Sequence, residues 1–341
     1  MKFLFTITAY LLATALAPAI PLAHTQPRPL LIAHRGSSGE APEHTLAAYR
    51  LAVEQGSDFV EQDLQLTKDG ALVCLHDADL ARTTNVAEVF PDRAASRDPS
   101  GTGRSRQGWY TIDFTLAEIK RLDAGSWFNR ANPFSARPNF AGERVPTLQE
   151  AIAAIGDRAG LYIEMKHYGF YKSMELDLAE RLARALDESG FKARPDRILI
   201  QSFSKESLLR MRDLAPHYGR VQLLPMEDRG REKETSKITL DLAREISQYA
   251  RGAGPNKNMI KSREDVALLQ KAGLVVHPYT FRGATTAAAR RPLDEAMPGG
   301  STVRHNMIEE ITKFVAFGID GGFTDYPAVW REAEPSFNKR R

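Results

Sequence analysis

Cysteine is almost absent from this chain of 341 residues, which contains only Cys74. A single cysteine excludes an intramolecular disulfide. The fold must therefore be stable through its apolar core, or through that core and a bound metal. We interpret Cys74 as a small buried apolar residue rather than as a reactive thiol.

An excess of charge of one sign is also lacking, since the formal net charge is only +3. This charge is too small to imply a surface that binds polyanions, and we expect no nucleic-acid partner. The hydrophobic fraction of 43% and the charged fraction of 26% are ordinary for a soluble globular protein. The length suits one large domain or two modest ones, and a parallel barrel of about 250 residues also fits as one domain.

The N-terminus has the pattern of a targeting segment, because Lys2 precedes an apolar stretch from Phe3 to about Ala17. Small residues and prolines follow this stretch. The pattern predicts a secretory signal peptide over residues 1–23, cleaved near Ala19 or Ala23, in preference to an uncleaved membrane anchor. We therefore expect a secreted or periplasmic protein with no stable membrane insertion after cleavage.

A glycine-rich G-x-G-x-x-G turn is missing after the first strand-like run, which disfavours a Rossmann-type open sheet. Short apolar runs alternate with helix-like segments after residue 27, which predicts parallel strands joined by right-handed crossovers. The candidate strands are residues 29–33, 59–66, 71–75, 160–164, 197–202, 220–224, 274–279 and 318–323. About eight such strands predict an α/β fold, a closed (β/α)8 TIM barrel over residues 28–333.

Residues from about 84 to 145, which follow the third candidate strand, interrupt this alternation. A structureless connection of that length is rare inside a compact domain. We predict instead a small insertion that caps one end of the barrel and contains a short helix over Leu116–Leu122. The segment Pro146-Thr147-Leu148-Gln149-Glu150 then predicts a capped helix start.

Polar residues stand where the candidate strands end, which is where active sites of parallel barrels lie. Glu61 and Asp63 are two residues apart on one strand, so both carboxylates project to the same face. Buried carboxylates repel each other unless a cation joins them, and Glu164 at a neighbouring strand end supplies a third oxygen ligand. A solvated strand edge or an ion-pair network is the simpler alternative. Apolar neighbours favour a hard-cation site for Mg²⁺ or Ca²⁺ rather than zinc.

His34 and His76 end two candidate strands next to these carboxylates and form the candidate acid–base pair. Imidazole titrates near neutrality, so one ring can accept a proton while the other donates one. Arg35 and Lys166 add fixed positive charge, and arginine suits bidentate contact with phosphate oxygens. Together these groups indicate a site for an anionic phosphoryl centre joined to a divalent metal.

Eight short motifs carry a resemblance to a known family. They are His34-Arg35-Gly36, Ala41-Pro42-Glu43-His44-Thr45, Glu61-Gln62-Asp63, Leu75-His76-Asp77, Ile163-Glu164-Met165-Lys166, Gln201-Ser202-Phe203, His277-Pro278-Tyr279-Thr280-Phe281-Arg282 and Phe323-Thr324-Asp325-Tyr326-Pro327. Each is weak alone, but all occur in order across nearly the whole mature chain. The sequence resembles the glycerophosphodiester phosphodiesterase family, in particular its secreted bacterial members.

The resemblance implies a barrel that hydrolyses a small glycerophosphodiester to an alcohol and sn-glycerol 3-phosphate. It implies that Glu61, Asp63 and Glu164 hold one divalent cation, Ca²⁺ more often than Mg²⁺ in secreted members. The remaining implied roles are acid and base for His34 and His76, and substrate or phosphate binding for Arg35, Lys166, Glu43, Gln201, Phe203 and Tyr279. His44 departs from the commoner Asn of the wider family, and we expect it to support the site from outside the ligand set.

For the mechanism, we expect one histidine to deprotonate the 2-hydroxyl of the substrate's glycerol, which attacks phosphorus. The other histidine protonates the leaving alcohol, and water then opens a cyclic phosphate. Direct attack by water uses the same residues. The alternatives are a phospholipase D-like or C-like enzyme on the same barrel and a non-catalytic surface protein. The sequence leaves open the alcohol head group, the physiological metal, the choice of base and the oligomeric state.

Overall fold

The computed structural model describes residues 28–132, 138–225, 237–283, 292–297 and 299–339. The signal peptide predicted for residues 1–23 lies outside this part of the chain. Among the described residues, no helix is both long enough and apolar enough to span a membrane.

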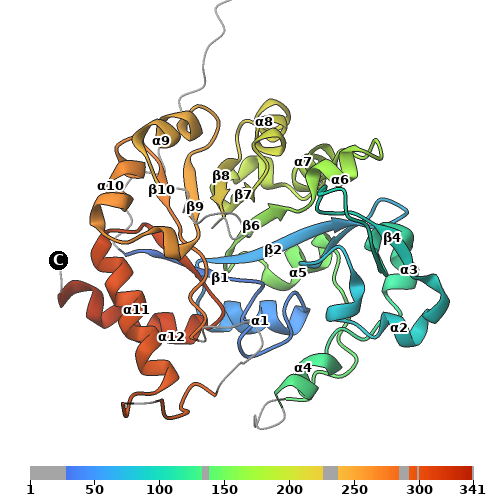
Figure 1. The fold of residues 1–341 in the computed structure, drawn as a ribbon, viewed down its shortest axis with the longest axis horizontal. Helices are drawn as coiled ribbons and strands as arrows, with labels where there is room; N and C mark the ends of the chain where they lie inside the picture. Colours follow the sequence, from blue (N-terminus) through green and yellow to red (C-terminus); the bar gives the residue numbers. More distant parts are fainter. Residues whose placement is uncertain (1–27, 133–137, 226–236, 284–291, 298, 340–341) are drawn as a thin grey trace, which may run out of the picture.

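Eight parallel strands form the barrel seen in Figure 1. They are β1 (Leu30–Ala33), β2 (Phe59–Leu66), β6 (Gly160–Met165), β7 (Ile198–Ser202), β8 (Gly219–Leu224), β9 (Gly252–Pro255), β10 (Val275–Val276) and β11 (Gly321–Thr324). Hydrogen bonds join them in the order β10-β9-β8-β7-β6-β2-β1-β11. The chain just after β10 approaches β11, where the amide of Phe281 donates to the carbonyl of Phe323 at 2.8 Å. The predicted TIM barrel is thus confirmed as a nearly closed barrel.

Helices surround the barrel and bury one face against it. The longer ones are α1 (Leu46–Glu54), α5 (Leu148–Ile155), α7 (Leu178–Glu188), α8 (Lys205–Leu214), α9 (Leu240–Ser247), α10 (Arg263–Gln270), α11 (Val303–Phe317) and α12 (Pro327–Ala333). In α7, for example, Leu178, Leu182 and Leu186 recur every four residues and are fully buried. The predicted helix start after Pro146 is also present, because Thr147 and Glu150 form a capping box at α5.

The third candidate strand is not part of the barrel wall, which corrects the sequence-based interpretation. β3 (Leu72–Cys74) runs antiparallel to the end of β2, with Leu64 opposite Cys74. The sixth barrel strand, β9, was missed because its sequence Gly-Ala-Gly-Pro lacks the branched residues that mark strands. Its small residues have a steric reason, since a Cβ on Gly252 would lie 2.8 Å from the Val275 side chain.

The insertion between β3 and α5 is a small folded unit rather than a long loop. Its elements include α2 (Val86–Val89), β4 (Ala95–Arg97), β5 (Arg106–Gly108), α3 (Leu116–Ile119) and α4 (Ser126–Ala131). β4 and β5 form an antiparallel pair, and α3 ends at Ile119 rather than at Leu122. An apolar cluster that includes the fully buried Phe114 packs this unit against β3 and is separate from the main barrel cluster. Cys74 is fully buried as predicted, and burial raises the pKa of its thiol to about 12.

Candidate active site

An apolar layer inside the barrel lies one step below the polar site. Ile32, Tyr162, Leu199, Val221 and Phe323 pack together there. The same face of a strand returns every two residues, so the next inward positions are His34 after Ile32, Glu164 after Tyr162 and Gln201 after Leu199. The apolar layer closes the barrel, and the polar side chains stand above it at the carboxyl ends of the strands.

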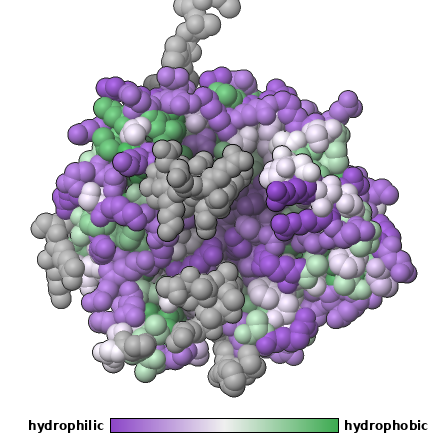
Figure 2. Space-filling view, in the orientation of Figure 1, coloured by the Kyte–Doolittle hydropathy of each residue, from purple (hydrophilic) through white to green (hydrophobic). Residues whose placement is uncertain are grey.

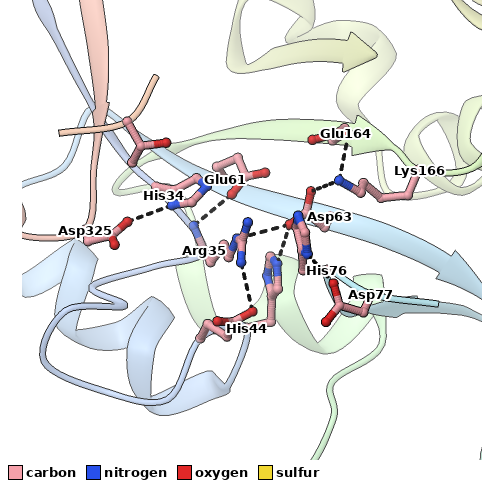
Figure 3. A network of polar contacts seen from close by, with 12 residues as sticks. His34, Arg35, His44, Glu61, Asp63, His76, Asp77, Glu164, Lys166 and Asp325 are labelled. Atoms are coloured by element: carbon pink, nitrogen blue, oxygen red, sulfur yellow. Dashed lines mark hydrogen bonds and ion pairs between the residues drawn. The ribbon is translucent and has the colours of Figure 1, made fainter. Parts of the chain in front are cut away.

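β2 contributes two inward carboxylates, and each is held by a neighbouring element (Figure 3). Glu61 accepts the backbone N–H of Arg35 at 2.8 Å and the side-chain amide of Gln201 at 3.3 Å. Asp63 lies beside Glu164 in the parallel register of β2 and β6. Both β2 carboxylates are only 1% exposed. Asp63 therefore has Glu61 on its own strand and Glu164 on the neighbouring strand, so the three carboxylates of the predicted trio lie on adjacent strands.

Burial, together with charge repulsion within this trio, changes its protonation. Burial and the neighbouring Asp63 raise the pKa of Glu61 well above its ordinary range. Burial likewise raises the pKa of Glu164 to about 8. Burial opposes ionisation of Asp63 too, but Lys166 and the nearby histidines hold its pKa well below the usual range. The negative charge of such a cluster can be neutralised either by protonation of its carboxylates or by a bound divalent cation.

The donor set suits a hard divalent cation. Asp63 Oδ1 is buried and has no hydrogen-bond partner within the described part of the chain, so a lone pair is available. Ligand atoms of His44, Glu61 and Asp63 lie within 4.8 Å of one another. Both nitrogens of His44 are already engaged, since Nε2 contacts Asp63 at 2.8 Å and Nδ1 contacts the Tyr49 hydroxyl at 2.9 Å. The ligand atoms that remain available are thus mainly carboxylate oxygens, which are the ligands that Mg²⁺ and Ca²⁺ prefer.

Each candidate catalytic histidine is held by a carboxylate through the same ring nitrogen. His34 Nδ1 lies 2.7 Å from Asp325, and His76 Nδ1 lies 2.5 Å from Asp77. Since these carboxylates accept the Nδ1 proton, the lone pair of each neutral ring is on Nε2. Burial and the Arg35 guanidinium lower the pKa of His34 to about 3 and that of His76 to about 4. Both rings are therefore neutral in the free site.

Arg35 and Lys166 place positive charge against the carboxylates. Arg35 has a positive φ of 58°, and its guanidinium donates to Glu43 at 3.0 Å and lies 3.4 Å from Asp63. Lys166 Nζ lies 3.1 Å from Glu164 and 3.7 Å from Asp63. Both cations therefore lie against the buried Asp63, each from a different element.

The turn that places Arg35 depends on Gly36, which also has a positive φ of 82°. A Cβ at Gly36 would lie 2.7 Å from the backbone of Ala48 in α1. Only glycine therefore lets the turn pack directly on this helix.

A cavity of about 300 Å³ opens beside Glu164 and Lys166. Its other lining residues include His167, Phe170, Phe203 and the loop 99–101 of the insertion. Phe203 is 43% exposed and makes an edge contact with Tyr279. Tyr279 donates its hydroxyl to the carbonyl of Leu224 and is not among the residues that line this cavity. Figure 2 shows a mostly hydrophilic face with a hollow near its centre.

Three residues that contact the site escaped sequence reasoning. Asp325 and Asp77 hold the two histidines, and Arg82 donates to both Asp77 and Glu43. Asp77 directly follows His76, so the sequence carried a local signal. The partnership of Asp325 with His34 spans 291 positions and becomes visible only when the barrel closes.

The fold and the buried polar site at the carboxyl ends of its strands define a class, the parallel-barrel enzymes. Comparison with known proteins gives the particular family. The profile of the "Glycerophosphoryl diester phosphodiesterase family" matches residues 34–329. The chain belongs to this family.

Individual relatives agree with this assignment. A "Glycerophosphodiester phosphodiesterase" of Bacillus subtilis (strain 168) is 36% identical, with 91% of this chain and 88% of the relative aligned. A protein of the same description from Haemophilus influenzae is 30% identical, with 94% of each chain aligned. Among solved structures, an Oleispira antarctica phosphodiesterase in complex with the product sn-glycerol-3-phosphate aligns with a TM-score of 0.61. It is 25% identical, and the alignment covers 90% of this chain and 97% of that one.

Proposed function

We propose that this protein hydrolyses glycerophosphodiesters to an alcohol and sn-glycerol 3-phosphate, with one divalent cation held by Glu61, Asp63 and Glu164. The observation that carries the proposal is the meeting of three buried carboxylates with two histidines, each held by a carboxylate through Nδ1. Family membership supports the substrate class. The product bound to the Oleispira antarctica relative is the same glycerol phosphate.

The metal would take the free carboxylate oxygens of the trio. When bound, a divalent cation offsets the carboxylate charge and polarises a phosphate oxygen. We assign the third ligand to Glu164 rather than to His44, because both nitrogens of His44 already have partners. The resemblance to secreted family members favours Ca²⁺ over Mg²⁺, and the carboxylate-rich donor set accommodates either ion.

The chain's own residues supply proton transfer and phosphate binding. Arg35 and Lys166 hold phosphate oxygens, while one histidine accepts the proton of the substrate's 2-hydroxyl through its free Nε2. The other histidine donates a proton to the leaving alcohol, after which water opens the cyclic phosphate. Because burial and Arg35 hold the pKa of both rings low, this second ring takes that proton from solvent on Nε2 when the anionic phosphate binds beside it. In the ring-opening step this ring, now neutral, accepts a proton from the attacking water, and the first histidine returns its proton to the 2-oxygen of the glycerol. Direct attack by water would use the same groups.

No specific observation favours either alternative, a lipid-acting enzyme or a non-catalytic surface protein. A lipid-acting enzyme would need an apolar surface around the site, and Phe203 is the one large apolar residue exposed among the described residues. A non-catalytic surface protein would have no use for two histidines held in the same tautomer beside buried carboxylates.

Hydrolysis of glycerophosphocholine by wild type, His34→Ala and His76→Ala tests the catalytic proposal. We expect each substitution to abolish turnover, because each removes one of the two proton-transfer groups. Calorimetric titration with Ca²⁺ should give similar affinities for all three proteins, since neither histidine is a ligand. A variant with near-normal kcat would contradict the two-histidine mechanism.

We also propose export of the protein, based on the predicted signal peptide over residues 1–23. Expression of the full chain in a bacterial host, followed by N-terminal sequencing of the periplasmic fraction, tests this. We expect a mature end just after Ala19 or Ala23. An intact Met1 on protein confined to the cytoplasm would contradict export.

A further inference from the structure

Arg82 lies at the start of the insertion, at the end of the short 3₁₀ helix η1 (Leu80–Arg82). Its guanidinium makes contacts with two different carboxylates. Nη1 and Nη2 donate to the two oxygens of Glu43 at 3.0 and 2.7 Å, and Nε donates to Asp77. This bidentate geometry is specific to arginine, because lysine has no planar fork of donors.

Each of these carboxylates also holds a residue of the candidate site. Asp77 presents its other oxygen to His76 Nδ1 at 2.5 Å. Glu43 shares one oxygen between Arg82 and Arg35, whose guanidinium lies 3.0 Å away. Arg82 is therefore linked to His76 through Asp77, and to Arg35, the proposed phosphate-binding residue, through Glu43.

The residues that Arg82 links differ in how far their side chains are buried. The side chain of Glu43 is 6% exposed, whereas that of Arg82 is 44% exposed. Glu43 pairs with Arg35 on one side and with Arg82, from the insertion, on the other. Loss of Arg82 would leave Asp77 free to rotate away from His76, since the side chain of Asp77 is itself 34% exposed.

We propose that Arg82 is a positioning residue that sets His76 and Arg35 together, through Asp77 and Glu43. This inference rests on the proposed function for its effect on turnover, although its effect on His76 can be observed without turnover. The insertion then has a role beyond covering the barrel, because its first turn orders two parts of the active site at once. Partners of this kind typically change activity by about 10- to 100-fold when removed.

Arg82→Gln, Arg82→Lys and Arg93→Gln form a matched set for the test. Arg93 belongs to the same insertion, donates to Glu118 at 2.8 Å and is 39% exposed, but it contacts no residue of the site. We expect Arg82→Gln to lower kcat/KM for glycerophosphocholine by about 10- to 100-fold, with kcat reduced and KM raised. Arg82→Lys should recover little of this loss, because it keeps the charge but cannot bridge both carboxylates. Arg93→Gln should retain wild-type kinetics.

Nitrogen NMR of the His76 ring gives a readout that does not depend on activity. In wild type we expect the tautomer with the proton on Nδ1, and in Arg82→Gln a mixture that includes the Nε2 tautomer. Comparison with His76→Asn assigns the signal. An unchanged His76 tautomer in Arg82→Gln would overturn the proposal, as would an equal loss of kcat/KM in Arg93→Gln. An inactive wild type with the expected tautomer change would contradict the proposed function and leave the positioning role supported.

Discussion

The two histidines of the site share a geometry but differ in exposure. His34 contacts Asp325, which lies at the other end of the chain, and its side chain is 11% exposed. His76 contacts the adjacent Asp77, and its side chain is 31% exposed. In both cases the carboxylate fixes the Nδ1 proton and leaves the lone pair on Nε2. Under the proposed mechanism the two carboxylates therefore matter as much as the rings they hold.

Replacement of Asp325 with Asn tests this dependence for His34. An amide can offer an N–H where the carboxylate offered an acceptor, so the ring can settle in the wrong tautomer. We expect kcat for glycerophosphocholine to fall by roughly 10²-fold or more, with little change in thermal stability. Asp294→Asn, at an exposed carboxylate that pairs with Arg304, serves as the control. A variant at Asp325 with kcat within a factor of about two of wild type would remove this carboxylate from the mechanism.

The turn between β1 and α1 is the element on which Arg35 depends, and Gly36 is its critical residue. Gly36→Ala combines a left-handed φ with a clash against the backbone of Ala48. We expect a destabilisation of roughly 1–3 kcal/mol and a marked loss of activity, because Arg35 is displaced. Chemical denaturation and steady-state kinetics measure the two effects.

Gly142→Ala is the matched control for this turn. Gly142 has a similar φ of 88° but nothing within 4 Å of its Cβ position. This variant should therefore show the conformational strain without the clash, and its activity should be normal. Equal effects of both substitutions would mean that the contact with α1 is unimportant.

The end of β10 places His277 inside the barrel, where its Nδ1 lies 3.1 Å from the Tyr162 hydroxyl. Burial lowers the pKa of His277 to about 4, although Asp320 partly opposes this shift. Since an unfolded histidine titrates near 6.5, the unfolded state binds more protons between about pH 6.5 and 4. The contribution of His277 to the free energy of unfolding is therefore at its maximum above pH 6.5. It falls by on the order of 3 kcal/mol as the pH falls towards 4.

Urea unfolding of wild type and His277→Gln at several pH values measures this contribution. The other buried histidines are common to both proteins, so the difference between the two curves isolates His277. We expect the stability of the variant to depend less steeply on pH over this interval. Parallel curves from pH 7 to 4 would contradict a neutral buried His277.

Particular elements show what the sequence could and could not predict at this scale. β2 was predicted with its correct bounds because apolar residues stand at both ends of Phe59–Leu66, with the two inward carboxylates between them. β3 was misplaced because a short apolar run has no feature that distinguishes a barrel strand from a hairpin arm. β9 was missed because close approach to β10 selects glycine and alanine, which carry no strand signal.

At the scale of the whole molecule, closure of the barrel assembles the site from residues far apart in the chain. The alternation of strands and helices was enough to predict a TIM barrel, and strand ends were enough to place His34, Glu61, Asp63 and Glu164 near one another. Contacts such as Asp325 to His34 and Arg82 to Glu43 depend on tertiary geometry. No local pattern encodes them, so the structure was needed to find them.

The hydrolysis of glycerophosphocholine, followed by phosphorus NMR, tests the central claim most directly. The wild-type protein is assayed with Ca²⁺, with EDTA, and after Ca²⁺ or Mg²⁺ is restored to the EDTA-treated sample. The predicted result is accumulation of sn-glycerol 3-phosphate that stops with EDTA and resumes with a divalent cation, Ca²⁺ more effectively than Mg²⁺. An unchanged rate in EDTA, or phosphocholine as the phosphorylated product, would contradict the account.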